Sequence, residues 1–126
     1  MKQFAVIGLG RFGTSVATSR YKMGYEVLAL DSSEEKIQAI VNDVTHAVVA
    51  DATDEAALKA LGLGNCDVVV VAIGQDMQAS ILATLVLKAS GVKRVVAKAQ
   101  NDLHGKVLEK VGADQVIYPE RDMGVR

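Results

Sequence analysis

The sequence predicts a doubly wound α/β fold, in which six parallel strands form one sheet with helices on both faces. Short, mostly β-branched apolar runs recur at intervals of about 20 to 26 residues, and helix-like segments fill the intervals. This alternation is typical of βαβ units, and right-handed crossovers wound in two halves give the strand order 3-2-1-4-5-6. The expected strands are residues 4–7, 27–30, 47–50, 68–72, 95–97 and 116–118.

The composition bounds the class of protein. With 126 residues, 50% apolar content and a net charge of −1, we expect one globular domain without the basic surface of a nucleic-acid binder. No apolar run reaches the roughly 18 residues of a membrane span, and the start of the chain lacks a signal-peptide pattern. The single cysteine, Cys66, cannot form an internal disulfide, and we expect it to be a small buried side chain. These features predict a cytoplasmic protein with no nucleic-acid partner.

The first expected strand runs into three glycines, Gly8, Gly10 and Gly13, at the spacing G-x-G-x-x-G. The first permits a tight turn, the second lets a pyrophosphate approach the backbone, and the third lets a helix pack close to the strand. That helix points free N–H groups toward bound phosphates, so the motif predicts a Rossmann-like nucleotide site that includes Phe12. Arg11 would pair well with a terminal phosphate, although it could also be an ordinary surface arginine.

Asp31 closes the second strand, 18 residues after Gly13. An acidic side chain at this place accepts hydrogen bonds from the ribose hydroxyls of an adenosine and disfavours NADP. It does not separate NAD(H) from ATP, ADP or AMP. Alternatively, Asp31 begins a helix cap together with Ser32 and Ser33.

Three further segments end strands at the same edge of the sheet and supply candidate contacts to a nucleotide. Thr53 could instead cap the following helix, and a lysine at a strand end is costly unless it meets water or an anion. The segments are Asp51, Ala52 and Thr53; Ile73, Gly74 and Gln75; and Lys98, Ala99 and Gln100.

Two further features bear on cations and on assembly. Glu120 follows the sixth strand and would be repelled by a triphosphate unless Mg²⁺ or Ca²⁺ lay between them; otherwise it is a solvated loop carboxylate. The expected helix over residues 78–89 is apolar nearly all round. Either its own domain buries it, or its second side is a subunit interface.

The chain also lacks familiar catalytic patterns. It has no G-x-S-x-G elbow, no Walker A lysine and no H-E-x-x-H pair, and His46 and His104 have no partners at zinc-ligand spacing. After six strands no residues remain for a substrate domain. We therefore expect a sensor rather than an enzyme. The alternatives are the NAD-binding domain of an oxidoreductase that lacks its catalytic half, and an interaction scaffold with a vestigial pocket.

Several motifs together resemble the N-terminal nucleotide-binding (RCK or KTN) domain of cytosolic regulators of potassium uptake, of the Ktr type and more distantly the Trk type. They are Gly8-Leu-Gly-Arg-Phe-Gly13, Ala72-Ile-Gly74, Lys98-Ala-Gln-Asn101, His104 and residues 106–114 and 119–124. The resemblance covers the whole chain, so residues 1–126 would be this domain, without the C-terminal lobe of full-length regulators. It implies binding of ATP or ADP, and in relatives NAD(H). It also implies a homo-oligomer, from a dimer to an octameric ring, that gates a K⁺-transporting membrane subunit through nucleotide exchange.

The resemblance also implies roles for individual residues. Arg11 would reach phosphates, including those of a nucleotide in the neighbouring subunit. Asp31, Ser32 and Ser33 would hold the ribose. The 51–53 and 73–75 segments would form the adenosine pocket. Lys98, Gln100 and His104 would lie near the phosphates, Glu120 would hold a cation between subunits, and the 78–89 helix would form the ring-assembly surface.

Overall fold

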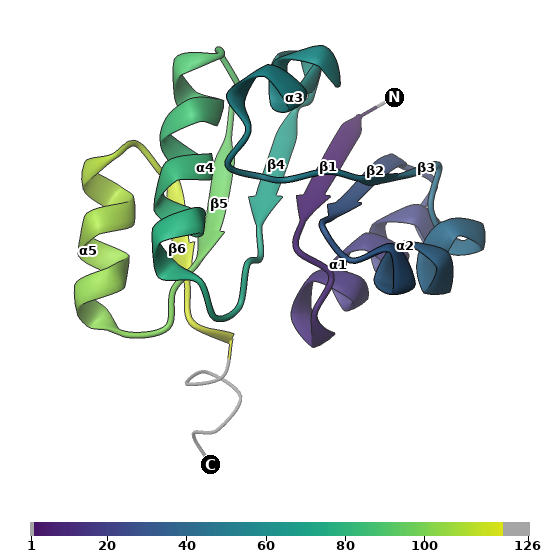
Figure 1. Cartoon of the computed structure of the whole chain (residues 1–126), viewed down its shortest axis with the longest axis horizontal. Coiled ribbons are helices and arrows are strands. Elements are labelled where there is room, and N and C mark those ends of the chain that lie inside the picture. Colours follow the sequence, from purple (N-terminus) through teal and green to yellow (C-terminus); the bar gives the residue numbers. More distant parts are fainter. Residues whose placement is uncertain (1, 120–126) are drawn as a thin grey trace.

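A computed structural model describes residues 2–119 of the chain. At its centre is one six-stranded sheet in the order β3-β2-β1-β4-β5-β6, with every neighbouring pair parallel (Figure 1). The predicted fold class and strand order are thereby confirmed. The strands are β1 (Gln3–Ile7), β2 (Glu26–Asp31), β3 (His46–Val49), β4 (Val68–Val71), β5 (Val95–Lys98) and β6 (Gln115–Ile117).

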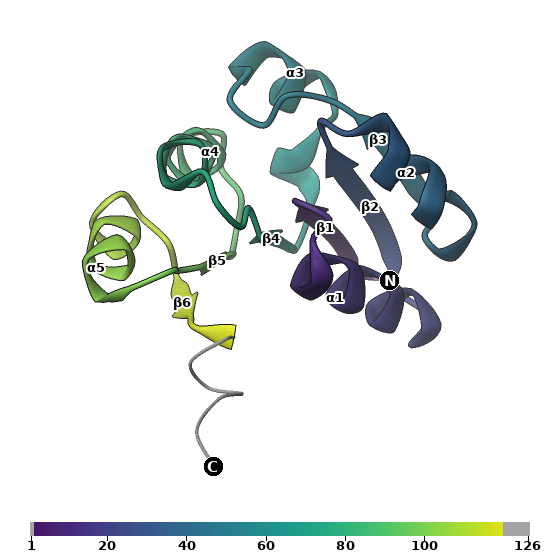
Figure 2. The ribbon, with the colours of Figure 1, turned by 60° about the horizontal axis from the view of Figure 1, so that its bottom comes forward.

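Helices cover both faces of this sheet (Figure 2). One face carries α1 (Arg11–Lys22) and α2 (Glu34–Ile40). The opposite face carries α3 (Glu55–Ala60), α4 (Met77–Ala89) and α5 (Asp102–Lys110). Short 3₁₀ turns over Val41–Asp43 and Leu63–Asn65 follow α2 and α3.

Two apolar cores hold the helices on the sheet, because successive strand residues point to opposite faces. Ile7 of β1 packs in one core with Leu87 of α4, whereas its neighbour Val6 packs in the other with Ala17 and Ile37. All five side chains are at most 4% exposed. Burying a side chain of this size stabilises the fold by about 1.5–3 kcal/mol, so both layers of helices are firmly attached.

The strand ends differ by one residue from those that the apolar runs predict. Four strands begin one residue earlier, at the polar residues Gln3, Glu26, His46 and Gln115. Conversely, β4 ends at Val71, although Ala72 still donates its N–H to the Ile7 carbonyl. The apolar pattern reports burial, whereas backbone hydrogen bonds define a strand. The two criteria therefore differ at the ends of the strands.

Side-chain caps begin four of the five α-helices. Ser33, Asp54, Asp76 and Asn101 each accept a hydrogen bond from a backbone N–H in the first turn of α2, α3, α4 and α5, respectively. Helix α1 instead begins after Gly10, which has no side chain to offer. Four helices are followed within two residues by a glycine with a positive φ angle: Gly24, Gly62, Gly91 and Gly112.

Helix α4 is apolar on two sides, as predicted. Ala83 and Leu87 are fully buried against the sheet, while Leu82 and Leu85 on the outer side are 41% and 49% exposed. Residues 2–119 therefore leave the outer side of α4 exposed.

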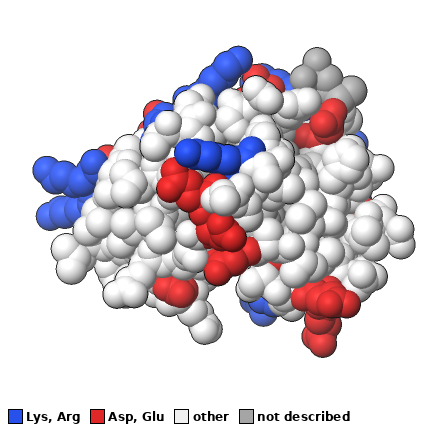
Figure 3. Space-filling model, turned by 45° about the horizontal axis from the view of Figure 1, so that its top comes forward, with Lys and Arg blue, Asp and Glu red and all other residues white. Residues whose placement is uncertain are grey.

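The remaining surface agrees with the mixed composition. Acidic and basic side chains are interspersed on the face drawn in Figure 3, which carries no broad basic area. Cys66 is buried, as expected, and burial raises the pKa of its thiol. Between residues 2 and 119, no helix is long and apolar enough to cross a membrane.

Candidate functional site

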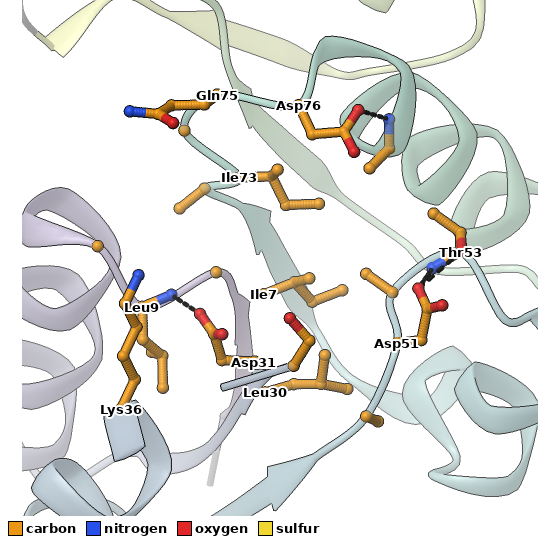
Figure 4. Close-up of a pocket in the computed structure, with 18 residues that line it drawn as sticks. Ile7, Leu9, Leu30, Asp31, Lys36, Asp51, Thr53, Ile73, Gln75 and Asp76 are labelled. Carbon is orange, nitrogen blue, oxygen red and sulfur yellow. Dashed lines mark hydrogen bonds between the residues drawn. The ribbon is translucent and has the colours of Figure 1, made fainter. Parts of the chain in front are cut away.

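A cavity of about 690 Å³ opens at the carboxyl ends of β1, β2, β3 and β4 (Figure 4). Its walls are the segments that follow these four strands. The strand order reverses between β1 and β4, and parallel sheets of this type bind ligands at that point. The cavity is therefore the candidate site.

The glycine loop after β1 has the geometry that its spacing predicts. Gly8 has a φ of +99°, which a residue with a side chain rarely adopts. A Cβ atom added to Gly13 would lie 1.8 Å from the Gly8 carbonyl oxygen, so α1 packs against the loop as only glycine allows. A Cβ added to Gly10 would meet nothing within 4 Å, and Gly10 lines the cavity. The backbone at Gly10 is thus open to a ligand.

The start of α1 is suited to an anion. Its cap residue, Gly10, makes no side-chain hydrogen bond, and no acidic residue lies in its first turn. The first N–H groups of a helix have no partners within the helix, and the helix dipole is positive at this end. Side chains cap the other four α-helices, whereas the start of α1 at the cavity edge has no side-chain cap.

Asp31 joins the glycine loop to the end of β2. Its Oδ2 accepts a hydrogen bond from the Leu9 N–H at 2.7 Å (Figure 4), and its Oδ1 accepts one from the Ser33 N–H at 2.8 Å. Each carboxylate oxygen can accept a second bond, so the side chain retains capacity for ligand hydroxyls. Ser33 is the cap of α2 and Ser32 lines the cavity, so the two serines have different places.

Asp51 organises the opposite wall. Its Oδ1 accepts hydrogen bonds from the backbone N–H of Thr53 at 2.8 Å and from the Thr53 hydroxyl at 2.7 Å. These bonds lower the pKa of the Asp51 carboxyl. The alternative that Thr53 caps α3 is wrong, because Asp54 is the cap and the Thr53 hydroxyl is bonded to Asp51.

The third wall of the cavity is the segment after β4, and a residue that follows β5 is hydrogen-bonded to it. Ile73, Gly74 and Gln75 line the cavity, and the side-chain amide of Gln100 donates a hydrogen bond to the Gly74 carbonyl. A Cβ added to Gly74 would lie 3.6 Å from the Lys98 ammonium nitrogen. Lys98 and Gln100 therefore border the cavity through Gly74 without lining it.

The charges around the cavity are divided between carboxylates and one lysine. Among its lining residues the carboxylates are Asp31, Asp51 and Asp76, and each accepts a backbone N–H bond. The cation among these lining residues is Lys36 of α2, whose side chain points toward Leu9 of the glycine loop (Figure 4). Negatively charged ligand groups thus have Lys36 and the α1 N-terminus on one side of the cavity.

The structure gathers about half of the predicted site residues in this cavity. Ten of them line it: Gly8, Gly10, Asp31, Ser32, Asp51, Ala52, Thr53, Ile73, Gly74 and Gln75. Eight others lie outside its lining: Arg11, Phe12, Gly13, Ser33, Lys98, Ala99, Gln100 and His104. Glu120, the predicted cation ligand, lies outside the described residues.

Packing explains why several predicted residues lie elsewhere. Phe12 packs against the α1–α2 core, and Ala99 is 4% exposed in the opposite core. His104 is 3% exposed and is bonded to Ser80 and to the backbone of Gln100. Arg11 is exposed at the start of α1, outside the cavity.

Some lining residues are absent from the sequence prediction. Asp76 and Ala79 belong to the start of α4, and the cap pattern of Asp76 before an apolar helix is a signal that could have found them. Lys36 has no such signal, because its place depends on how α2 packs. Within residues 2–119 there is no cluster of three or more histidine, cysteine or carboxylate groups that could hold a metal ion.

Comparison with known proteins gives consistent matches along nearly the whole chain. The sequence model of the TrkA-N domain matches residues 4–119. The chain is 55% identical over 125 residues to Ktr system potassium uptake protein A of Bacillus subtilis, and 49% identical over 125 residues to the protein of that name from Vibrio alginolyticus. Both matches include 99% of this chain but only 56% and 57% of the relatives, so the chain spans little more than half their length.

Solved structures share the fold at low sequence identity. The TrkA-N domain of the inner membrane protein ybaL from Escherichia coli superposes with a TM-score of 0.86, at 17% identity, over 97% of this chain and 90% of that one. The GsuK channel bound to NAD superposes with a TM-score of 0.85, at 14% identity, over 98% of this chain and 22% of that one. GsuK bound to ADP gives a TM-score of 0.84, at 14% identity, over 98% and 32% of the two chains.

Proposed function

This chain belongs to the TrkA-N domain family, and from that membership we propose that it is the nucleotide-binding domain of a Ktr-type regulator of potassium uptake. One observation carries the proposal. The uncapped start of α1 and the carboxylate of Asp31 border the same cavity at the switch point of the sheet. The first suits phosphates and the second suits a ribose, so together they suit an adenine nucleotide.

The cavity offers a place for each part of such a nucleotide. The phosphates approach Gly10, where the backbone is open, with Lys36 on the same side. The ribose hydroxyls donate to Asp31, and the adenosine lies between the 51–53 and 73–75 segments. Ser32 lines the cavity next to Asp31 on the ribose side, and Ser33 supports this side by capping α2.

The proposed signal is the difference between ATP and ADP. A ligand drives a conformation only by binding it more tightly than another, so the γ-phosphate needs partners of its own. Arg11 is exposed outside the cavity, which suits contact with the phosphates of a nucleotide in a neighbouring subunit. Glu120 would hold Mg²⁺ or Ca²⁺ against that nucleotide, with Lys98 and Gln100 near the phosphates.

The proposed partners are further copies of the chain and a membrane subunit that transports K⁺. The exposed apolar side of α4, with Leu82 and Leu85, would join subunits into a ring of up to eight. The ring would lie on the cytoplasmic side of the membrane and gate K⁺ flux as its shape changes. Because the relatives are longer, we expect their additional length to hold the C-terminal lobe.

NAD(H) is the second candidate ligand. Asp31 accepts the ribose of either nucleotide, and structures of the same fold are described with NAD, ADP and AMP. An NAD-binding half of an oxidoreductase remains the alternative from another class of protein. Relatives that are 49–55% identical to this chain are named potassium uptake proteins, which favours the regulator.

Titration calorimetry of this chain with ATP, ADP and NADH tests the proposal. We expect ATP and ADP to bind, and Asp31→Asn to weaken both, because the neutral amide accepts ribose hydroxyls less well. Asp67→Asn is the matched control, since Asp67 also accepts a backbone N–H but lies outside the cavity lining. NADH binding far more tightly than ATP, with an unchanged ATP affinity in Arg11→Ala, would contradict the regulator and favour the oxidoreductase.

A further inference from the structure

Helices α4 and α5 contain all three of the buried polar side chains in the part of the chain that the structure describes. Ser80, Thr84 and His104 are each at most 3% exposed. A buried polar group costs free energy unless it is hydrogen-bonded, so each of them needs partners. The partners of His104 determine which form its imidazole takes.

The hydrogen bonds around His104 fit one tautomer. The backbone N–H of Gln100 lies 3.1 Å from His104 Nδ1, so Nδ1 acts as an acceptor and carries no proton. A neutral imidazole then has its proton on Nε2, which donates to the Ser80 hydroxyl oxygen at 2.7 Å. The Ser80 hydroxyl in turn donates to the Met77 carbonyl at 2.9 Å. Every donor in this chain of bonds meets an acceptor.

An imidazolium does not fit the same place. Protonation would put an N–H on Nδ1, facing the Gln100 N–H, and two donors would then oppose each other. Burial acts in the same direction, since it lowers the pKa of His104.

The segment that His104 holds reaches the candidate cavity. Asn101 caps α5 by accepting the His104 N–H at 2.8 Å, while the His104 ring accepts the N–H of Gln100, the residue before the cap. The Gln100 side chain then donates to the carbonyl of Gly74, which lines the cavity. Hydrogen bonds thus connect α4, His104, Gln100 and the cavity wall.

We propose that His104 is a positioning residue and not a nucleotide contact: its neutral imidazole holds the Gln100 segment against Gly74 and ties this wall of the cavity to α4. Its effect on nucleotide affinity rests on the function proposed above. The arrangement of the imidazole can be measured without any nucleotide.

Two amide variants distinguish the contribution of His104 Nδ1 from that of Nε2. In H104N the amide oxygen takes the place of Nδ1, so it keeps an acceptor for Gln100 and loses the bond to Ser80. In H104Q the amide takes the place of Nε2, so it keeps the bond to Ser80 and loses the acceptor for Gln100. Both variants remove the aromatic ring, so loss of packing is common to both.

We expect H104Q, which loses the bond to the Gln100 segment, to weaken ATP binding about three- to tenfold, which corresponds to one hydrogen bond, and H104N, which keeps that bond and loses only the one to α4, to weaken it less. The amide of Gln100 should exchange with solvent faster in H104Q than in H104N. Equal losses of affinity in both variants, or none in either, would show that His104 does not position the cavity wall.

Nitrogen NMR of the native His104 imidazole shows which of its two ring nitrogens carries the proton. We expect an unprotonated Nδ1 and a protonated Nε2 at pH 7.5, and a Gln100 amide protected from exchange. A protonated Nδ1 would overturn the proposal at once. If the native chain binds neither ATP nor ADP while the imidazole has the expected form, the proposed function fails and the structural link from α4 to Gly74 stands.

Discussion

Gly10 and Gly13 belong to one motif, yet the space around their Cβ positions differs completely. At Gly13 a Cβ would collide with the Gly8 carbonyl oxygen, whereas at Gly10 it would point into open space beside the cavity. Gly13 is therefore required for the packing of α1 against the loop, and Gly10 leaves room for a ligand to approach the backbone. The spacing predicts both roles, but only the structure gives the distances on which a test can be based.

A pair of alanine substitutions tests this division. We expect Gly13→Ala to reduce the free energy of unfolding by about 2–4 kcal/mol, because the backbone must shift to admit the methyl group. Gly10→Ala should cost at most about 1 kcal/mol, the difference between glycine and alanine at a helix cap, but should weaken ATP binding by filling the phosphate approach. Urea denaturation and calorimetry measure the two effects. A stable Gly13→Ala variant would contradict the packing role.

His104 makes the stability of the chain sensitive to mild acid. Its pKa is lowered by burial in the folded protein from the ordinary value of 6.5. Below about pH 6.5 the unfolded chain therefore takes up a proton more readily than the folded chain does. The stabilisation is complete above that pH and is lost as the pH falls toward the lowered pKa.

Melting temperatures between pH 7.5 and 5 measure this effect. We expect a decline in the native chain and a smaller decline in H104Q, because the glutamine at position 104 does not titrate. The carboxyls of Asp51, Asp67 and Asp114, whose pKa values are also lowered, act nearer and below their ordinary value of 3.8 and so in a separate range. An equal decline in both proteins would remove His104 as its source.

At the scale of single elements, α4 differs from the other helices because apolar residues cover two of its sides. Its inner side is buried against the sheet, whereas Leu82 and Leu85 on its outer side are exposed. The hydrophobic pattern reveals both sides equally and does not say which one faces the sheet. Which side faces the sheet depends on the rotation of α4 about its own axis where it packs on β4 and β5.

A charge on the outer side of α4 tests its role in assembly. We expect Leu85→Lys to reduce self-association of the chain, measured by analytical ultracentrifugation, because a buried unpaired ammonium would be costly in an interface. Tyr21→Lys is the matched control, since Tyr21 is 41% exposed on α1, on the opposite face of the sheet. If both substitutions change the sedimentation equally, or neither does, α4 is not the interface.

At the scale of the whole molecule, nucleotide binding should stabilise the fold. The candidate cavity joins segments at the ends of four strands, including the glycine loop before α1, with residues of α2 and α4, so a ligand that fills it links distant parts of the chain. A ligand that binds only the folded state adds about 2.7 kcal/mol at 100 times its dissociation constant. For a domain of this size we expect ATP to raise the melting temperature by several degrees.

Thermal unfolding with ATP, and with adenosine as the control, checks this prediction. Adenosine lacks the phosphates that α1 would bind, so its effect should be smaller at equal concentration. Equal shifts would contradict a phosphate site at α1. If neither compound raises the melting temperature, the cavity does not bind nucleotides, and a plain interaction scaffold becomes the better description.

The sequence was sufficient for the fold class, the strand order, the glycine turn and the acidic residue at the end of β2. Each of these depends on local chemistry: apolar runs of the length of a strand, glycines where the chain must turn or pack closely, and a carboxylate at a set distance from them. Such signals act over short stretches of chain, so they can be read without the fold.

Tertiary structure alone decided which residues share the cavity. Lys36 lines it because of the way α2 packs, and Ala99 does not because its side chain turns into the core. The resemblance places His104 near the phosphates, and the structure adds that its ring is buried and bonded to Ser80 and Gln100. These outcomes depend on contacts between residues far apart in the chain, and only the packing of helices on the sheet brings such residues together.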